Sequence, residues 1–319
     1  MVVNMKEAVK LPVIMAPMFL VSSPRMVIEG CKAGIIGSFP LLNARTSTDL
    51  ERWFEEITSE LEEYEAMSTV QAAPWAVNFI SHSSNHRFEE DLQLIKKYQP
   101  PIVISSLGDP SPVVSAVHSY GGLVFSDVIN LFFAKKAAEK GVDGLILVCN
   151  GAGGHAGTLN PMAFVSAVKE FWTGYTILSG CISNGRDILA AQVLGADFAF
   201  MGTRFISAHE SMASEAYQNM LIDSSMDDLI YTDVFSGVNA NYLVPSIRKA
   251  GLDPDNLVKE GGLGFAKEKG NAKAWKDIWS AGQGVHSIKK TQSTVEIIEE
   301  LKNDYKEAKS KINTLSYKA

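Results

Sequence analysis

One histidine lies in a glycine-rich stretch in the middle of the chain, Val148-Cys149-Asn150-Gly151-Ala152-Gly153-Gly154-His155-Ala156-Gly157. The apolar run before it, Gly144-Leu145-Ile146-Leu147-Val148, predicts a buried strand, and residues 158–172 predict a helix. The glycines let the backbone approach a flat or anionic ligand closely. An imidazole can remove a proton from a ligand or, once protonated, hold an anion. We therefore take His155 as the candidate catalytic residue. A glycine-rich surface turn with an exposed histidine is the alternative.

Glycines also follow the seventh and eighth predicted strands. One of these strands ends at Ser179-Gly180-Cys181 and the next at Met201-Gly202-Thr203. In α/β barrels a phosphate often binds between the loops after strands seven and eight, where backbone N–H groups face the anion. This pair of loops therefore predicts a phosphate site. The alternative is that Gly180 and Gly202 only permit tight turns between strand and helix.

The fold that positions these loops can be predicted from the rest of the sequence. Short apolar runs alternate with helical segments along most of the chain. Continuous apolar strands are typical of a parallel sheet that is buried on both faces, and eight of them close a barrel. We therefore predict an α/β fold, a TIM (β/α)8 barrel, with its chemistry at the carboxyl ends of the strands. The predicted strands are residues 11–18, 34–40, 75–80, 102–107, 123–127, 145–149, 175–180 and 198–201.

The alternation is lost between residues 209 and 280. We predict that this segment is a mostly helical insertion after strand eight, which packs over the mouth of the barrel as a lid or substrate domain. Residues 1–208 and 281–319 then form the barrel domain. A charged amphipathic helix over residues 293–313 is expected to be the last barrel helix or an outer brace.

Composition excludes several classes of protein. The 319 residues are 46% hydrophobic, which is enough for a large core. A net charge of −7 and the lack of a basic cluster argue against a nucleic-acid partner. The longest apolar runs are strand-sized, far below the roughly 20 residues of a membrane span, so we expect a cytoplasmic protein without a membrane partner. Three widely spaced cysteines predict neither a disulfide nor a metal site.

Several motifs together resemble the nitronate monooxygenase family, formerly called 2-nitropropane dioxygenases, over nearly the whole length. They are Ala16-Pro17-Met18, the stretch 151–157 around His155, and the runs 180–186 and 201–205, and Asn78 and residues 281–284 also fit. The resemblance implies a TIM barrel that binds FMN. It also implies oxidative denitrification of alkyl nitronates, and of nitroalkanes as a further candidate, to carbonyl compounds and nitrite with O2. The oligomeric state stays open, with a homodimer as the candidate.

The resemblance also implies roles for single residues. His155 corresponds to the active-site histidine of the family. Asp127 is a candidate to orient His155, although it could instead cap the helix that begins near Asn130. His82 and Tyr242 are weaker substrate candidates. The residues expected to bind the cofactor are Ala16, Pro17, Met18, Asn78, Gly153, Gly154, Ser179, Gly180, Cys181, Met201, Gly202, Thr203 and Gln283.

The sequence also departs from the family pattern. Cys181 stands where many members have a second glycine, and Gly151 and Val148 replace a common Glu and Gln. The loop is therefore less polar than usual, which affects the expected substrate more than the flavin. Two alternatives remain. One is an FMN-dependent enoyl-thioester reductase that uses NAD(P)H, and the other is a flavin-binding protein without turnover.

Overall fold

Eight parallel strands form a barrel in the computed structural model, which describes residues 5–257, 268–269, 272–273 and 275–314. The strands are β1 (Val13–Met15), β2 (Gly37–Pro40), β3 (Trp75–Ile80), β4 (Ile102–Ser106), β5 (Leu123–Val128), β6 (Gly144–Val148), β8 (Tyr175–Ser179) and β9 (Phe198–Met201). They are neighbours in chain order, and β1 pairs with β9. Ile14 also pairs with Ile36, directly before β2, with Met15 N–H to Ile36 O at 2.8 Å. These bonds bring the two edges of the sheet together, so the predicted TIM barrel is confirmed.

The strands are apolar throughout because both of their faces are buried. In β6 all five residues are buried. Ile146 belongs to the cluster that fills the barrel, whereas Leu145 and Leu147 pack in the layer beneath the helices. This alternation follows from the two-residue period of a strand, and it explains why no polar position interrupts the run.

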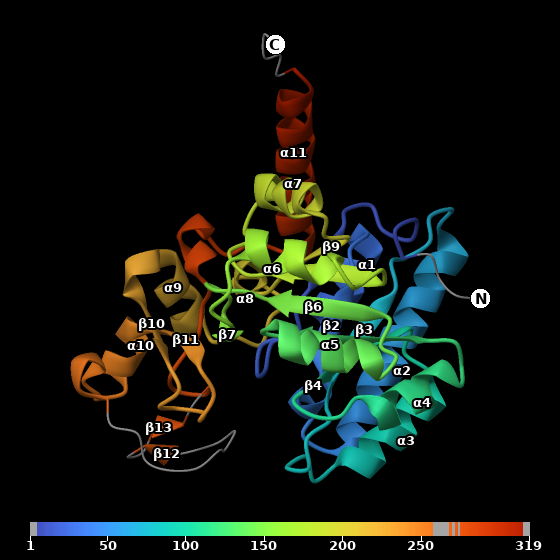
Figure 1. Cartoon of the computed structure of the whole chain (residues 1–319), viewed down its shortest axis with the longest axis horizontal. Helices are drawn as coiled ribbons and strands as arrows, with labels where there is room; N and C mark the ends of the chain where they lie inside the picture. Colours follow the sequence, from blue (N-terminus) through green and yellow to red (C-terminus); the bar gives the residue numbers. More distant parts are fainter. Residues whose placement is uncertain (1–4, 258–267, 270–271, 274, 315–319) are drawn as a thin grey trace.

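Helices surround the barrel (Figure 1). They are α1 (Pro24–Ala33), α2 (Ser47–Met67), α3 (Phe88–Tyr98), α4 (Ser111–His118), α5 (Leu131–Glu139), α6 (Pro161–Lys169), α7 (Gly185–Leu194) and the short α8 (Thr203–Ile206). The helix after His155 is shorter than predicted. The Asn130 side chain accepts the Phe133 N–H and caps α5, so the alternative role of Asp127 as the cap is wrong.

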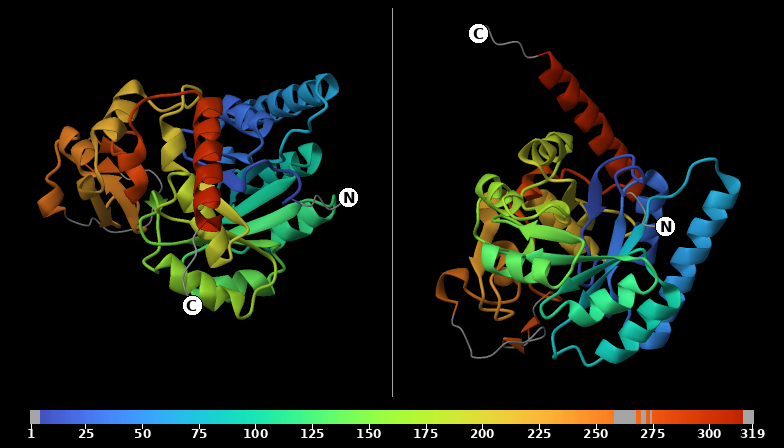
Figure 2. Two further views of the ribbon diagram at one scale, coloured as in Figure 1. Left: turned by 90° about the horizontal axis from the view of Figure 1, so that it is seen from above. Right: turned by 45° about the vertical axis from the view of Figure 1, so that its right-hand side comes forward.

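The last helix, α11 (Thr294–Asn313), agrees closely with the predicted range and begins at a capping box formed by Ser293 and Glu296. It packs against α1 and α7, where an eighth barrel helix belongs, because α8 has only four residues. Arg204 of α8 is buried and bonds to Glu300 of α11 at 2.9 Å. The far end of α11 extends beyond the barrel (Figures 1 and 2).

The segment between residues 209 and 280 is mixed rather than mostly helical. Besides α9 (Glu215–Asp223) and α10 (Val244–Lys249), it contains the antiparallel hairpin of β10 (Leu229–Thr232) and β11 (Ala240–Leu243) and the short pair β12 (Glu268–Lys269) and β13 (Ala272–Lys273). It lies at the end of the barrel toward which β6 points (Figure 1). Its strand β11 pairs with β7 (Gly154–His155), so the hairpin and the histidine loop form one three-stranded sheet. No helix among the described residues is long and apolar enough to cross a bilayer.

Candidate active site

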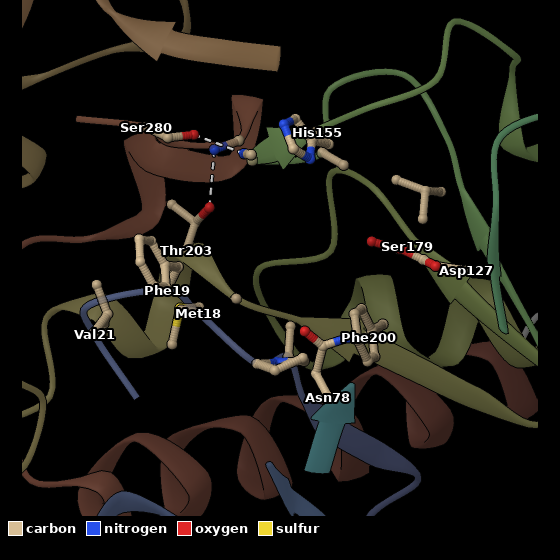
Figure 3. Close-up of a pocket in the computed structure, with 18 of the residues that line it drawn as sticks. Met18, Phe19, Val21, Asn78, Asp127, His155, Ser179, Phe200, Thr203 and Ser280 are labelled. Carbon is tan, nitrogen blue, oxygen red and sulfur yellow. Dashed lines mark hydrogen bonds between the residues drawn. The ribbon is translucent and has the colours of Figure 1, made fainter. Parts of the chain in front are cut away.

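A cavity of about 300 Å³ lies at the carboxyl ends of the barrel strands (Figure 3). This volume is at the lower end of the range of about 300–1,000 Å³ that is usual for ligand pockets. Its walls are mostly apolar, with a smaller number of polar groups among them. The sequence-predicted residues that line it are Ala16, Pro17, Met18, Asn78, Asp127, Gly153, Gly154, His155, Ser179, Gly180, Cys181, Gly202 and Thr203.

Polar side chains from three neighbouring strands form a chain of hydrogen bonds on one wall. Asn78 of β3 donates both amide hydrogens, to the Ile104 carbonyl at 3.1 Å and to the Ser106 Oγ at 2.7 Å. The hydroxyl of Ser106, at the end of β4, is in turn hydrogen-bonded to the Asp127 carboxyl of β5. The amide oxygen of Asn78 is therefore the group that this residue can offer to a donor on a ligand.

Asp127 is the last residue in this series of hydrogen bonds. Burial raises the pKa of its carboxyl to about 6, although the hydrogen bond from Ser106 opposes the shift. A group with such a pKa can exchange a proton near neutral pH. The bond that the structure gives Asp127 is with Ser106, and its predicted role in orienting His155 remains a prediction.

The glycine-histidine loop is held mainly by the segment that follows the barrel. Gly154, with φ of +70°, donates its N–H to the Ser280 Oγ at 2.6 Å (Figure 3). The Asn241 amide donates to the Ala152 carbonyl at 2.7 Å, and Ala156 N–H donates to the Asn239 carbonyl at 3.1 Å. The loop is therefore fixed on both sides of His155, and its geometry depends on residues far away in the sequence.

The His155 ring lies at the top of the cavity in Figure 3. Its Nε2 is 3.2 Å from the Ser236 Oγ, and the Trp275 ring meets it edge to face at 5.4 Å. Burial lowers the pKa of His155 to about 4, because the charged imidazolium loses its hydration. The imidazole is therefore neutral at pH 7 and can act as a base.

The loops after β8 and β9 form the predicted phosphate end. Gly180 and Cys181 have consecutive positive φ values, +119° and +59°. A side chain at Gly180 would meet the Asn150 carbonyl at 2.8 Å, so the turn requires glycine. Gly202 differs, since a Cβ there would make only ordinary contacts of 3.5 Å or more. The backbone at Gly202 is therefore open to a ligand, and Thr203 beside it accepts the Gly282 N–H at 2.8 Å (Figure 3).

Four predicted site residues do not line the cavity. Met201 is buried beneath the helices, because the neighbouring Phe200 takes the pocket side of the strand. Gln283 is exposed, with its Oε1 3.4 Å from the Cys181 Sγ. His82 is exposed in the loop after β3 and bonds to Ser84. Tyr242 is fully buried in β11.

Other residues at the site were not predicted. Ser106 could have been found, since it is a polar residue at the end of an apolar strand. Ser236, Trp275 and Ser280 belong to the irregular segment, where no sequence pattern marks them.

The fold and the pocket together define a TIM-barrel enzyme with its active site at the carboxyl ends of the strands. A model of the nitronate monooxygenase family matches residues 3–304. The chain belongs to this family of flavin-dependent oxidoreductases, as the resemblance in the sequence indicated.

Two relatives and one solved structure show what the chain is similar to. A nitronate monooxygenase of Paraburkholderia phytofirmans is 25% identical over 284 residues, which are 76% of each chain. A (3aS,4S,5R,7aS)-5-hydroxy-7a-methyl-1-oxo-octahydro-1H-indene-4-carboxyl-CoA dehydrogenase of Rhodococcus jostii is 24% identical over 291 residues, which are 84% of this chain and 78% of the relative. The solved structure of a nitroalkane oxidase from Streptomyces ansochromogenes has a TM-score of 0.79 at 19% identity, covering 96% of this chain and 99% of its own.

Proposed function

We propose that this protein uses FMN to convert alkyl nitronates and O2 to carbonyl compounds and nitrite. The observation that carries the proposal is a buried, neutral imidazole on a glycine loop that lines an apolar pocket together with the glycine turns after β8 and β9. The family to which the chain belongs supports the same reaction.

The residues present fit FMN. Ala16, Pro17 and Met18 offer an apolar wall to a flat ring, and the Asn78 amide oxygen can accept the single ring N–H of an oxidised flavin. The phosphate would be held by the backbone of Gly180 and Gly202. When bound, FMN supplies a one-electron acceptor for the nitronate.

The protein's own groups act on the other substrate. The neutral His155 can remove the proton next to the nitro group of a nitroalkane, which converts it to the nitronate. Val148 and Gly151 line the same pocket, and they replace the Gln and Glu that are common in the family pattern. The substrate that we propose is therefore a simple alkyl compound without a charged group beyond the nitronate.

The direct test is oxygen uptake and nitrite release by the yellow protein, as isolated, with ethyl nitronate and with neutral nitroethane. We expect turnover of the nitronate well above that of free FMN at the same concentration. Turnover no faster than free FMN would refute the proposal and favour a flavin-binding protein without catalysis.

A cytoplasmic location and a homodimer remain predictions from the sequence.

A second candidate is a flavin enzyme that acts on a thioester, such as the enoyl-thioester reductase considered above. The observation that favours it is the Rhodococcus relative, whose name gives a CoA thioester as the compound on which it acts. Its match also covers more of this chain than the match to the Paraburkholderia protein. Mixing the protein with NADH or NADPH without oxygen separates the two functions. Rapid loss of the yellow colour would favour the reductase, whereas a nitronate oxidase keeps its colour.

A further inference from the structure

The hydroxyl group of Ser236 lies at the centre of a buried network behind His155. Ser236 is only 4% exposed and belongs to the connection between β10 and β11. Its Oγ donates to the Val238 carbonyl at 2.9 Å and accepts from the Tyr242 hydroxyl at 3.2 Å. The Val238 N–H makes a longer contact with the same oxygen, at 3.4 Å. His155 Nε2 also lies 3.2 Å from this oxygen.

The hydrogen that Ser236 donates to Val238 determines where the imidazole proton lies. A serine hydroxyl has one hydrogen to donate and two lone pairs to accept with. The Val238 carbonyl can only accept, so it takes the single hydrogen of the hydroxyl. The hydroxyl then has no hydrogen left for His155, and its oxygen can only accept from Nε2 as it does from Tyr242. The contact with His155 is therefore favourable only if Nε2 carries a hydrogen and donates it.

We propose that Ser236 is a positioning residue that holds His155 in the Nε2–H tautomer, so that Nδ1 is the nitrogen that accepts the substrate proton. This role rests on the proposed function. It goes beyond that function because it names the reacting nitrogen and the residue that selects it. In neutral histidine the tautomer is set by the hydrogen bond that the other nitrogen makes.

The same network also responds to proton transfer. When Nδ1 takes a proton, the ring becomes positive and its Nε2–H bond to Ser236 becomes a stronger, charge-assisted bond. The Ser236 hydroxyl and the Val238 carbonyl point their negative ends toward the ring in series. A carboxylate in this place would hold the ring protonated at rest, whereas a hydroxyl leaves it neutral, in agreement with its lowered pKa.

The test compares Ser236→Ala and Ser236→Thr, with Tyr242→Phe as the matched control. Tyr242→Phe removes a bond to the same hydroxyl but leaves the bond to His155. NMR of the holoprotein with 15N-labelled histidine, assigned with His155→Ala, reports the tautomer directly. We expect the Nε2–H form in the wild type and in Tyr242→Phe, and a mixture of tautomers in Ser236→Ala.

Kinetics supply the second readout. Loss of one hydrogen bond is worth about a tenfold change in rate, so kcat/KM of Ser236→Ala for neutral nitroethane should fall about tenfold or more. For ethyl nitronate, which needs no proton removal, it should change much less. Threonine at position 236 should restore most of the nitroethane rate, and the FMN content should be equal in all variants.

The Nδ1–H tautomer in the wild type would overturn the proposal. An unchanged tautomer in Ser236→Ala, or an equal loss with both substrates, would also overturn it. If the wild type turns over neither substrate, the proposed function fails, but the NMR measurement still decides the role of Ser236.

Discussion

Replacement of Asp127 by asparagine should stabilise the protein at neutral pH. The carboxyl pKa is about 6 in the folded protein and has an ordinary value of 3.8 in the unfolded chain. As the pH rises through this interval, the unfolded chain loses its proton first, so folding becomes less favourable until both states are ionised above pH 6. The cost at pH 7 is at most about 3 kcal/mol, since a tenfold difference in proton affinity is worth about 1.4 kcal/mol.

Asparagine keeps an oxygen for the Ser106 hydroxyl and carries no charge, so it removes this cost. With an unfolding entropy of about 2 cal/mol/K per residue, the midpoint of thermal unfolding should rise by up to about 5 °C at pH 7. The gain should shrink toward zero as the pH falls to 4. Calorimetry of the wild type and Asp127→Asn across this range measures both quantities.

Asp109 provides a control of opposite sign. Bonds from the Ser111 hydroxyl and N–H lower its pKa to about 2, so Asp109→Asn should destabilise the protein at pH 7 and lose this effect as the pH falls. An Asp127→Asn protein that is no more stable than the wild type at pH 7 would show that the ionised carboxylate is well accommodated, and our reasoning about its burial would be refuted.

Three further substitutions test the site. His155→Ala should keep the yellow colour but lose nitroethane turnover by a factor of about 10² to 10⁴, and a colourless protein would instead make His155 a structural residue. Gly202 has a φ of −108° and its Cβ would make no close contacts, so Gly202→Ala should change the free energy of unfolding by only about 0.5 kcal/mol. It should nevertheless lower the FMN content of the purified protein. Unchanged FMN content would contradict the proposal that the backbone of Gly202 holds the phosphate. Gly284→Ala would place a Cβ 1.6 Å from the Ser183 Oγ, so we expect the free energy of unfolding to fall by about 1–3 kcal/mol. A second substitution, Ser183→Ala, should restore part of this loss. An unchanged midpoint of thermal unfolding in Gly284→Ala would count against this packing.

The barrel could be predicted because its signals are local. Each strand is buried on both faces and therefore appears in the sequence as an unbroken apolar run. The helix starts are also local, because Ser23 and Ser293 each cap a helix by accepting a backbone N–H three residues further along the chain. The pocket residues at the strand ends follow from the same pattern. Met201 shows where the pattern fails as a guide to the pocket. Whether Phe200 or Met201 faces the pocket depends on the register of β9, which the apolar run does not reveal.

The surroundings of His155 could not be predicted for a different reason. Its contact with Ser236 joins residues that are 81 positions apart, and Asn241 reaches Ala152 across 89. The pairing of β7 with β11 involves only two residues of the glycine loop, too few to show an alternating pattern. A turn-like sequence became a strand because a partner from the following segment supplied the hydrogen bonds.

The sheet that joins Gly154 and His155 to β11 limits how the protein can diversify. A segment that forms part of the reactive loop cannot be exchanged between relatives as an independent module, because a new hairpin would bring a new register and a new position for the imidazole. Recombination between family members should therefore succeed when residues 150–157 and 209–280 are inherited together. For protein engineering, these two stretches are one unit, although 51 residues separate them in the chain.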